Sequence, residues 1–411
     1  MRKMLFTGFA PNQRFKDVLR AMKFLFLPWM YFKWIKGGSV LEAENWLKNF
    51  FGVKTAVLVD SGRSALLLGL KALKIGNGDE VIVQAYTCVV VINAIKHSGA
   101  RPVYVDIDGS LNINTDDLEN KITDKTKAVI VQHTFGNPAD IDTILGVCSR
   151  RKIKLIEDCA HSFGAMYKGQ KVGTFGDLAF FSFGSDKCVS CVRGGALVSG
   201  NNEITEEIEK VYRELPNTPW VKVLQNLLHY PIFFKGKILY PVFLGKIILA
   251  LAKKMHITER VIYDCEKSGG KVDFYPAKLA NALADLLLLQ LNDFNLISEH
   301  RKKIAEIYEK NIANNKVVKP ALSDWAIPLR YNLLTDAPDA LAAIAKKQGV
   351  ILGDWYRTAV APSDIDVNKT GYEAGACPAA ENFANKSINL PTDINISEKD
   401  AFRIVNIINN Y

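Results

Sequence analysis

The sequence lacks the features that define several common classes of protein. Its 6 histidines contain no closely spaced pair typical of a metal site, so we expect no metal ligands. An odd number of cysteines, 7 in all, argues against a disulfide scaffold and favours a reducing compartment. With 28 glycines and 15 prolines in 411 residues, collagen-like and low-complexity structures are excluded as well. The first apolar run starts too far into the chain for a secretory leader and lacks a small-residue cleavage site.

What is present is the composition of a globular protein, 48% hydrophobic and 23% charged, with enough length for two domains. The formal net charge of +9 is concentrated in two stretches, 18–41 and 215–258, that contain no acidic residue. Both stretches are also rich in aromatic and aliphatic residues. Their basic residues are Arg20, Lys23, Lys33 and Lys36 in the first stretch, and Lys222, Lys235, Lys237, Lys246, Lys253 and Lys254 in the second.

Neither stretch is predicted to span a membrane, because charges interrupt both and a spanning helix needs roughly 20 consecutive apolar residues. Lysines beside aromatic anchors, without acids, are typical of segments that lie in a membrane interface. They predict contact with an anionic membrane surface. Alternatively, the two stretches bury their apolar faces in an oligomer interface and extend their lysines to solvent. We expect no nucleic-acid site, because aliphatic residues dilute the basic ones.

After about residue 42 the pattern changes to short apolar runs that alternate with helical periodicity. Buried strands separated by helices predict an α/β fold with a mostly parallel sheet covered on both faces. The expected strands are 55–59, 80–83, 102–106, 128–132, 154–157 and 178–183.

The same patterns divide the chain into four parts. We expect an N-terminal basic-aromatic arm at 1–41, a large domain at 42–210, an inserted basic-aromatic helical segment at 211–271, and a long helix with a small α/β domain at 272–411.

Three motifs fall at the ends of predicted strands, where parallel sheets bind ligands. Asp60-Ser61-Gly62 lies between a strand and a helix, and a glycine turn there exposes N–H groups that favour a phosphate. Asp158 and Lys187 follow two further strands. A lysine that bonds to an aldehyde, a carboxylate that holds a ring nitrogen protonated and a phosphate-binding turn are the requirements of pyridoxal 5′-phosphate chemistry. We therefore predict this cofactor, with Lys187 and Asp158 as catalytic residues.

Further motifs accompany these three, at 61–66, 78–82, 99–108, 157–165, 172–177, 181–183, 377–381 and 389–392. Through them the sequence from Gly38 onward, apart from the inserted stretch, resembles the DegT/StrS-type sugar aminotransferases. These are fold-type-I pyridoxal-phosphate enzymes. The resemblance implies a homodimer with the cofactor between its subunits, glutamate as the usual amino donor, and a keto-sugar on a nucleotide as the acceptor.

Carried over residue by residue, the resemblance implies a set of cofactor contacts. Lys187 would bond to the cofactor, Asp158 would pair with its ring nitrogen, and His161 would lie near the ring. The phosphate would be bound by Gly62, Arg63, Ser64 and Ser182, and the candidates for the face of the ring are Tyr86 and Cys88.

Some positions depart from the family pattern. Cys88 stands where the family usually has an aromatic residue over the ring, so either Tyr86 takes that role or the site accepts a different substrate. Arg63 replaces a common threonine and brings a charge to the phosphate or the substrate. A family segment that reaches the neighbouring subunit reads Asp273-Phe274-Tyr275 here, which leaves that contact open. For Cys188 and Cys191 we expect a packing role.

The sequence thus predicts a cytoplasmic aminotransferase of glycan or polysaccharide biosynthesis, acting on a nucleotide-linked keto-sugar and peripheral to the cytoplasmic face of a membrane. Two alternatives stay open. The acceptor is a lipid-linked ketone, or the chain is a non-catalytic membrane-attached scaffold that keeps the fold. Since Lys187 is present, a related sugar dehydratase with histidine at that position is disfavoured.

Overall fold

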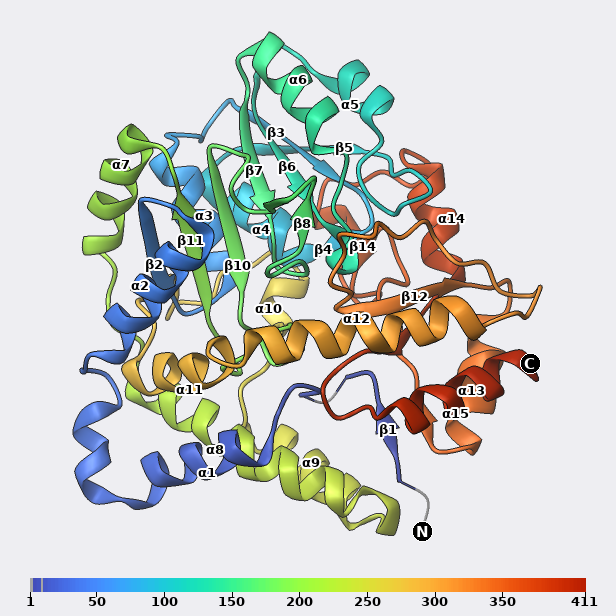
Figure 1. The fold of residues 1–411 in the computed structure, drawn as a ribbon. Coiled ribbons are helices and arrows are strands. Elements are labelled where there is room, and N and C mark those ends of the chain that lie inside the picture. Colours follow the sequence, from blue (N-terminus) through green and yellow to red (C-terminus); the bar gives the residue numbers. More distant parts are fainter. Residues whose placement is uncertain (1–2, 9) are drawn as a thin grey trace.

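The structure, a computed structural model, describes residues 3–8 and 10–411 and centres on one seven-stranded sheet (Figure 1). The strand order is β2-β11-β10-β7-β6-β3-β5, and all neighbours are parallel except the two pairs that β11 makes. The strands are β2 (Thr55–Val59), β3 (Glu80–Gln84), β5 (Arg101–Val105), β6 (Thr126–Gln132), β7 (Lys154–Asp158), β10 (Leu178–Ser182) and β11 (Gly195–Ser199).

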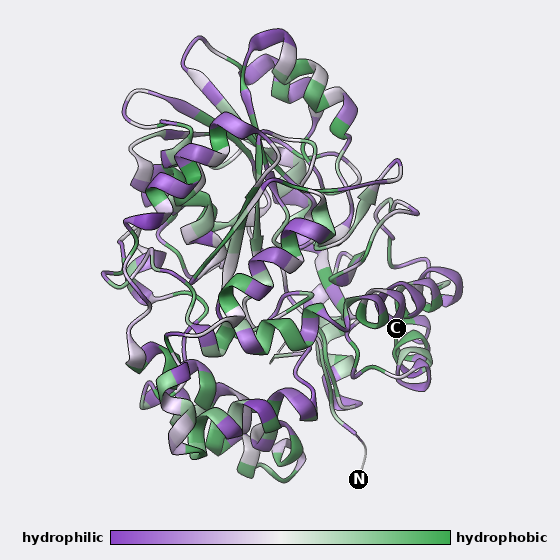
Figure 2. Ribbon diagram, turned by 60° about the vertical axis from the view of Figure 1, so that its left-hand side comes forward, coloured by the Kyte–Doolittle hydropathy of each residue, from purple (hydrophilic) through white to green (hydrophobic). Residues whose placement is uncertain are grey.

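Burial on both faces explains why these strands read as continuous apolar runs in the sequence. In β2, Ala56 and Leu58 pack on one face with α2 (Ser39–Phe51) and α11 (Asn281–Leu291), whereas Val57 and Val59 pack on the other with α3 (Gly62–Ala72) and α4 (Val89–Ser98). Figure 2 shows the hydrophobic sheet enclosed by helices of alternating hydropathy. The covering helices are α2 (Ser39–Phe51), α3 (Gly62–Ala72), α4 (Val89–Ser98), α5 (Thr115–Lys121), α6 (Ile141–Arg151), α7 (Asn202–Arg213) and α11 (Asn281–Leu291). The predicted α/β fold with a mostly parallel sheet is confirmed.

Helix α12 (Phe294–Asn311) leads from the large domain into a smaller C-terminal unit. A two-stranded antiparallel sheet lies there, made by β12 (Arg330–Leu334) and β15 (Ser387–Pro391). Its helices are α13 (Pro338–Lys347), α14 (Pro378–Lys386) and α15 (Glu398–Asn409). Two short parallel pairs join distant parts of the chain: β1 (Leu5–Phe6) with β13 (Val350–Ile351), and β4 (Thr87–Cys88) with β14 (Val360–Ala361). A third short pair, β8 (Met166–Tyr167) with β9 (Gln170–Lys171), is a local antiparallel hairpin.

The two basic-aromatic stretches lie side by side below the large domain (Figure 1). The Phe15 ring at the start of α1 lies 5.7 Å from the Phe234 ring of α8. Gly236 of α8 packs against Leu249 of α9, and a side chain on Gly245 would collide with the Gly236 carbonyl. The elements are α1 (Phe15–Phe26), the 3₁₀ helix η1 (Pro28–Lys33), α8 (Trp220–Ile238), η3 (Tyr240–Val242), α9 (Leu244–Lys254) and, on the way to the large domain, α10 (Asp264–Lys267). Within the described residues, no helix has the length and hydropathy needed to cross a membrane.

Candidate functional site

The carboxyl ends of β7 and β10 open into a cavity of about 410 Å³. This is the edge of a parallel sheet at which ligands bind. Of the nine residues predicted to form the site, the structure brings seven together in its wall: Gly62, Arg63, Cys88, Asp158, His161, Ser182 and Lys187.

The N-terminus of α3 forms one end of the cavity. Ser61 caps this helix, since its hydroxyl accepts a hydrogen bond from the backbone N–H of Ser64. Gly62 allows the helix to approach β10 closely, because an added Cβ would lie 2.9 Å from the Ser182 Cβ. A helix N-terminus with exposed N–H groups beside a serine hydroxyl has the chemistry of a phosphate site.

Asp158 is the last residue of β7, and its carboxylate is buried in the cavity wall. One oxygen accepts a 2.9 Å hydrogen bond from the Ala160 N–H. Burial raises the pKa of Asp158 to about 6, and the Ala160 hydrogen bond, Lys187 and His133 only partly oppose this rise. A cationic ring nitrogen beside this carboxylate would hold it ionised at neutral pH.

Lys187 lies in the loop after β10, where two contacts fix its backbone. Its N–H donates to the Gly184 carbonyl at 3.0 Å, and its own carbonyl accepts a hydrogen bond from the side-chain amide of Asn12. The Nζ lies 5.1 Å from the centre of the Trp355 ring. Burial lowers the pKa of Lys187 despite the nearby carboxylates, which enlarges the fraction of neutral, nucleophilic amine.

His161 stands in a stack of rings at the cavity. Its ring lies parallel to that of Phe135 at 5.6 Å and close to parallel with that of Trp355 at 5.8 Å. Burial, reinforced by Lys187 and Arg330, lowers the pKa of His161 well below its usual range, so its imidazole is neutral. Nδ1 accepts from the Phe135 N–H at 3.4 Å, which leaves Nε2 to donate to the Tyr356 hydroxyl at 3.3 Å.

Two predicted site residues lie outside the cavity wall. Tyr86 is fully buried, its hydroxyl donates to Ser387 at 2.7 Å, and it is not among the residues that line the cavity, so its place over the cofactor ring stays a prediction that this lining does not support. The Ser64 side chain is paired with the Ser61 hydroxyl at 2.9 Å and belongs to the helix cap. Trp355 and Tyr356, which the sequence prediction omits, supply the aromatic wall instead.

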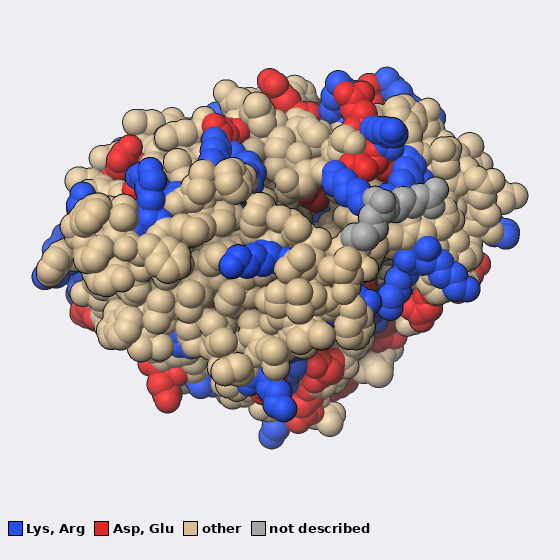
Figure 3. All heavy atoms as spheres, turned by 90° about the horizontal axis from the view of Figure 1, so that it is seen from below, with Lys and Arg blue, Asp and Glu red and all other residues tan. Residues whose placement is uncertain are grey.

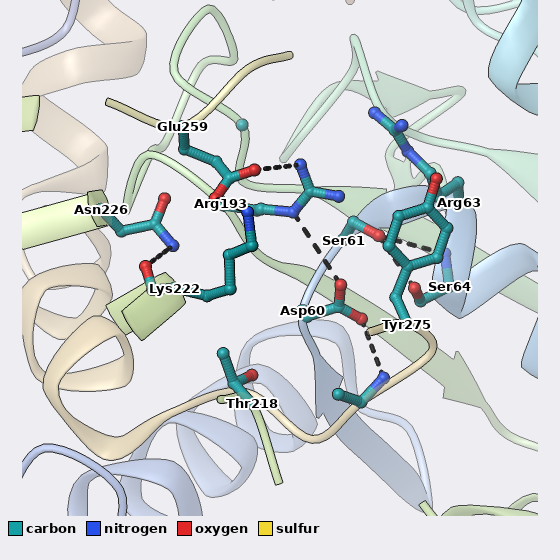
Figure 4. Close-up of polar contacts among 12 residues, drawn as sticks. Asp60, Ser61, Arg63, Ser64, Arg193, Thr218, Lys222, Asn226, Glu259 and Tyr275 are labelled. Atoms are coloured by element: carbon teal, nitrogen blue, oxygen red, sulfur yellow. Dashed lines mark hydrogen bonds and ion pairs between the residues drawn. The ribbon is translucent and has the colours of Figure 1, made fainter. Parts of the chain in front are cut away.

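Arg63 lines the cavity, but its side chain is not directed at the end of α3. The guanidinium forms an ion pair with Glu266 and lies 5.7 Å from the centre of the Tyr275 ring. Figure 4 shows Arg63 beside Tyr275. Buried Glu266 therefore already neutralises the Arg63 charge that was expected beside the phosphate or the substrate, while binding of the phosphate by the Gly62-Arg63-Ser64 turn stays a prediction. Tyr275 makes this contact within the same chain.

A buried cluster of charges, also absent from the sequence prediction, lies behind the α3 N-terminus (Figure 4). Arg193 stands between Asp60, at 3.9 Å, and Glu259, at 3.4 Å, and Lys222 reaches Glu259 at 3.5 Å. Asp60 also accepts a 3.0 Å hydrogen bond from the Ala277 N–H. Burial raises the pKa of Asp60, against the opposing effect of Arg193. The cluster joins the end of β2 to the segment before β11. The sequence feature that could have indicated it is a charged residue directly before each of two glycine turns, Asp60 before Ser61-Gly62 and Arg193 before Gly194-Gly195.

The residues present fit pyridoxal 5′-phosphate. One cavity is lined by the amine of Lys187, the buried carboxylate of Asp158 and the aromatic rings of Trp355 and Tyr356. The N-terminus of α3, where Gly62 allows close approach to β10, lies at the same cavity. Among the described residues that line the cavity, Lys187 is the one lysine. The one group of described side chains with the spacing of metal ligands is His133, Glu157 and Cys159, which do not line the cavity. There Glu157 already accepts hydrogen bonds from the N–H groups of Gly173, Phe175 and Gly176.

Known proteins resemble this chain over most of its length. The model of the DegT/DnrJ/EryC1/StrS aminotransferase family matches residues 31–218 and 254–409. The chain is 38% identical over 408 residues to the dTDP-3-amino-3,6-dideoxy-alpha-D-galactopyranose transaminase of Aneurinibacillus thermoaerophilus, covering 97% of each chain. It is 29% identical over 386 residues to the GDP-perosamine synthase of Escherichia coli O157:H7, covering 92% of each.

Solved structures share the fold. Helicobacter pylori PseC, an aminotransferase involved in the biosynthesis of pseudoaminic acid, superposes with a TM-score of 0.75 at 20% identity, covering 99% of this chain and 98% of its own. Bacillus subtilis ntda, solved with bound cofactor PMP, gives a TM-score of 0.75 at 19% identity, with 99% and 85% covered.

Proposed function

The chain belongs to the DegT/DnrJ/EryC1/StrS aminotransferase family, and from this premise we propose that it transfers an amino group from glutamate to a keto-sugar carried on a nucleotide. Its cofactor is pyridoxal 5′-phosphate, and we infer that it acts as a cytoplasmic homodimer in glycan biosynthesis. Relatives named for GDP-linked and dTDP-linked sugars support the acceptor class. The observation that carries the proposal is the convergence of Lys187, Asp158 and the α3 N-terminus on one cavity.

Each of these groups has a definite task in aminotransfer. When bound, pyridoxal phosphate supplies an aldehyde that captures amines and a ring that withdraws electrons from the reacting carbon. Asp158 holds positive charge at the ring nitrogen, and the end of α3 with Ser182 holds the phosphate. Lys187 would hold the cofactor through its amine and, when free, would move a proton at the substrate carbon. The imidazole of His161 is neutral because its pKa is lowered, and its hydrogen bond to the Tyr356 hydroxyl orients that ring of the aromatic wall.

The same cavity offers donors for a nucleotide diphosphate. Arg193 and Arg260 both line it. Nε of Arg193 is paired with Asp60, but two other buried N–H groups, Nη2 of Arg193 and Nε of Arg260, have no hydrogen-bond partner among the described residues. Unsatisfied buried guanidinium donors favour a ligand with phosphate oxygens.

The visible absorption spectrum of the purified protein tests the proposal. Wild type loaded with the cofactor should show a yellow absorption band that glutamate bleaches. Lys187→Ala should lack both the band and the bleaching, whereas Lys125→Ala, a change at an exposed lysine elsewhere, should keep both. A wild-type protein that stays colourless with added pyridoxal phosphate would contradict the proposal and favour a scaffold role. After bleaching by glutamate, nucleotide-linked keto-sugars should restore the band.

A further inference from the structure

The family match leaves out two parts of the chain, and the structure brings these two parts together. The unmatched residues before 31 contain α1, and the unmatched segment 219–253 contains α8 and nearly all of α9. These helices pack against one another along one side of the molecule. They form a layer added to the aminotransferase scaffold, and we name it the basal layer, comprising α1, η1, α8, η3 and α9.

The basal layer exposes large apolar side chains in unusual number. From η1, Phe32 is 86% exposed and Trp29 is 64% exposed, and from the end of η3 Phe243 is 62% exposed. Further exposed apolar side chains in the layer are Phe15, Leu19, Met22, Phe26, Tyr31, Ile238, Val242, Leu244, Ile247 and Leu251. Figure 3, a view from below, shows a broad field of uncharged residues on this side, with carboxylates only around its margin. Contiguous apolar surface of this kind marks a binding face.

The exposed charge of the layer is of one sign, because its one acidic residue, Asp17 of α1, is fully buried. Seven lysines of the layer are exposed and have no carboxylate within ion-pair distance among the described residues; Lys36, in the loop directly after η1, is counted with them. They are Lys23, Lys33, Lys36, Lys235, Lys246, Lys253 and Lys254. The remaining basic groups are occupied within the protein. Arg20 pairs with Asp285, and Lys237 donates to the Ala10 carbonyl at 2.6 Å.

This charge decides between two occupants of the face. A second copy related by a twofold axis would bring together two faces of the same positive charge, with no exposed acid on either face, which is unfavourable. An anionic lipid surface instead supplies the missing negative charge, and its headgroup region accepts aromatic rings. No described helix could cross the bilayer, so contact is confined to the interface.

We propose that the basal layer docks the enzyme onto an anionic membrane surface. The exposed rings of Trp29, Phe32 and Phe243 enter the headgroup region, and the lysines neutralise lipid charge. This attachment is independent of aminotransfer, so its test does not depend on whether the proposed reaction is correct.

Vesicle flotation of the full-length, cofactor-loaded protein tests the proposal. We expect flotation with vesicles of phosphatidylcholine containing phosphatidylglycerol, little flotation with pure phosphatidylcholine, and release at high salt. Neutralising Lys246, Lys253 and Lys254 together to glutamine should weaken partitioning on the order of 100-fold, since each lysine near anionic lipid contributes about fivefold. The double variant Trp29→Ser, Phe32→Ser should also lose flotation, which would show that the rings contribute beyond charge.

Matched variants in the C-terminal unit provide the control. Lys346, Lys347 and Lys399, on α13 and α15, are exposed and outside the basal layer, and their joint change to glutamine should leave flotation unchanged, as should Phe402→Ser. Absence of flotation with anionic vesicles at low salt would overturn the proposal. So would equal losses in the basal and control variants. Sedimentation velocity of Trp29→Ser, Phe32→Ser covers the other occupant: an oligomer that dissociates in this variant would assign the face to a second copy.

Discussion

Replacing Asp158 by asparagine should stabilise the cofactor-free protein while it disables the enzyme. Asp158 is 4% exposed, and one of its carboxylate oxygens accepts a hydrogen bond from the Ala160 N–H. The side-chain oxygen of an asparagine can accept the same hydrogen bond. Burial raises the pKa of Asp158 from its ordinary 3.8 to about 6. Because one pKa unit corresponds to about 1.4 kcal/mol, the ionised carboxylate destabilises the folded state by roughly 3 kcal/mol at pH 8.

The sign of the pH dependence follows from the direction of this shift. An acid whose pKa is higher in the folded state binds more protons there, so wild type loses stability as pH rises from about 4 to 6. The neutral asparagine does not titrate. The gap between variant and wild type should therefore be near zero below pH 4, reach about half its full size at pH 5, and be complete above pH 7.

Thermal unfolding of the cofactor-free proteins measures the gap. With roughly 2.1 cal/mol/K of unfolding entropy per residue over 411 residues, 3 kcal/mol corresponds to a rise of about 3 °C in Tm at pH 8. Exposed Asp324→Asn should change nothing. Added pyridoxal phosphate should reverse the order, because only the carboxylate pairs with a protonated ring nitrogen. An Asp158→Asn protein that melts below wild type at pH 8, or a gap independent of pH, would refute the reasoning.

Two other changes probe the surroundings of the cavity. Arg193→Met leaves Asp60 as an unpaired buried charge and should lower Tm at pH 8 by about 4 °C, the equivalent of roughly 3–5 kcal/mol. Adding Asp60→Asn should recover most of this loss in Tm, and a double variant that melts as low as Arg193→Met would contradict the pairing. Gly62→Ala places a Cβ 2.9 Å from that of Ser182 and should weaken cofactor binding roughly tenfold, or about 1.4 kcal/mol, in absorbance titrations, whereas unchanged affinity would argue against phosphate binding at this end of α3.

The sheet was predictable because each strand that lies buried between two layers of helices must be apolar on both faces. Every strand expected from an apolar run is present within two residues of its expected bounds. The one strand of the seven-stranded sheet that the prediction omits is β11. It begins at Gly195, where a side chain would collide with the Ser61 carbonyl carbon at 2.4 Å, and sequence alone interprets such a glycine pair as a turn.

The polar part of the site was predictable where its residues follow the strands directly, as Asp158 and Lys187 do. The aromatic wall was not, because Trp355 and Tyr356 come from the C-terminal unit, and no spacing in the sequence shows which of its segments returns to the sheet edge. The direction of the Arg63 side chain depends likewise on Glu266, a distant acid of the inserted region. Whether the two basic-aromatic stretches meet was equally a matter of tertiary packing.

The hydrogen bond from Asn12 to the Lys187 carbonyl changes what counts as the smallest working enzyme. Asn12 is buried, Arg301 donates to its side-chain oxygen, and α1 begins only three residues later at Phe15. A shortened protein confined to the family match would keep Lys187 yet lose this support for its loop. If the basal layer attaches the protein as proposed, the segment that enters α1 also supports the loop that holds the reacting amine.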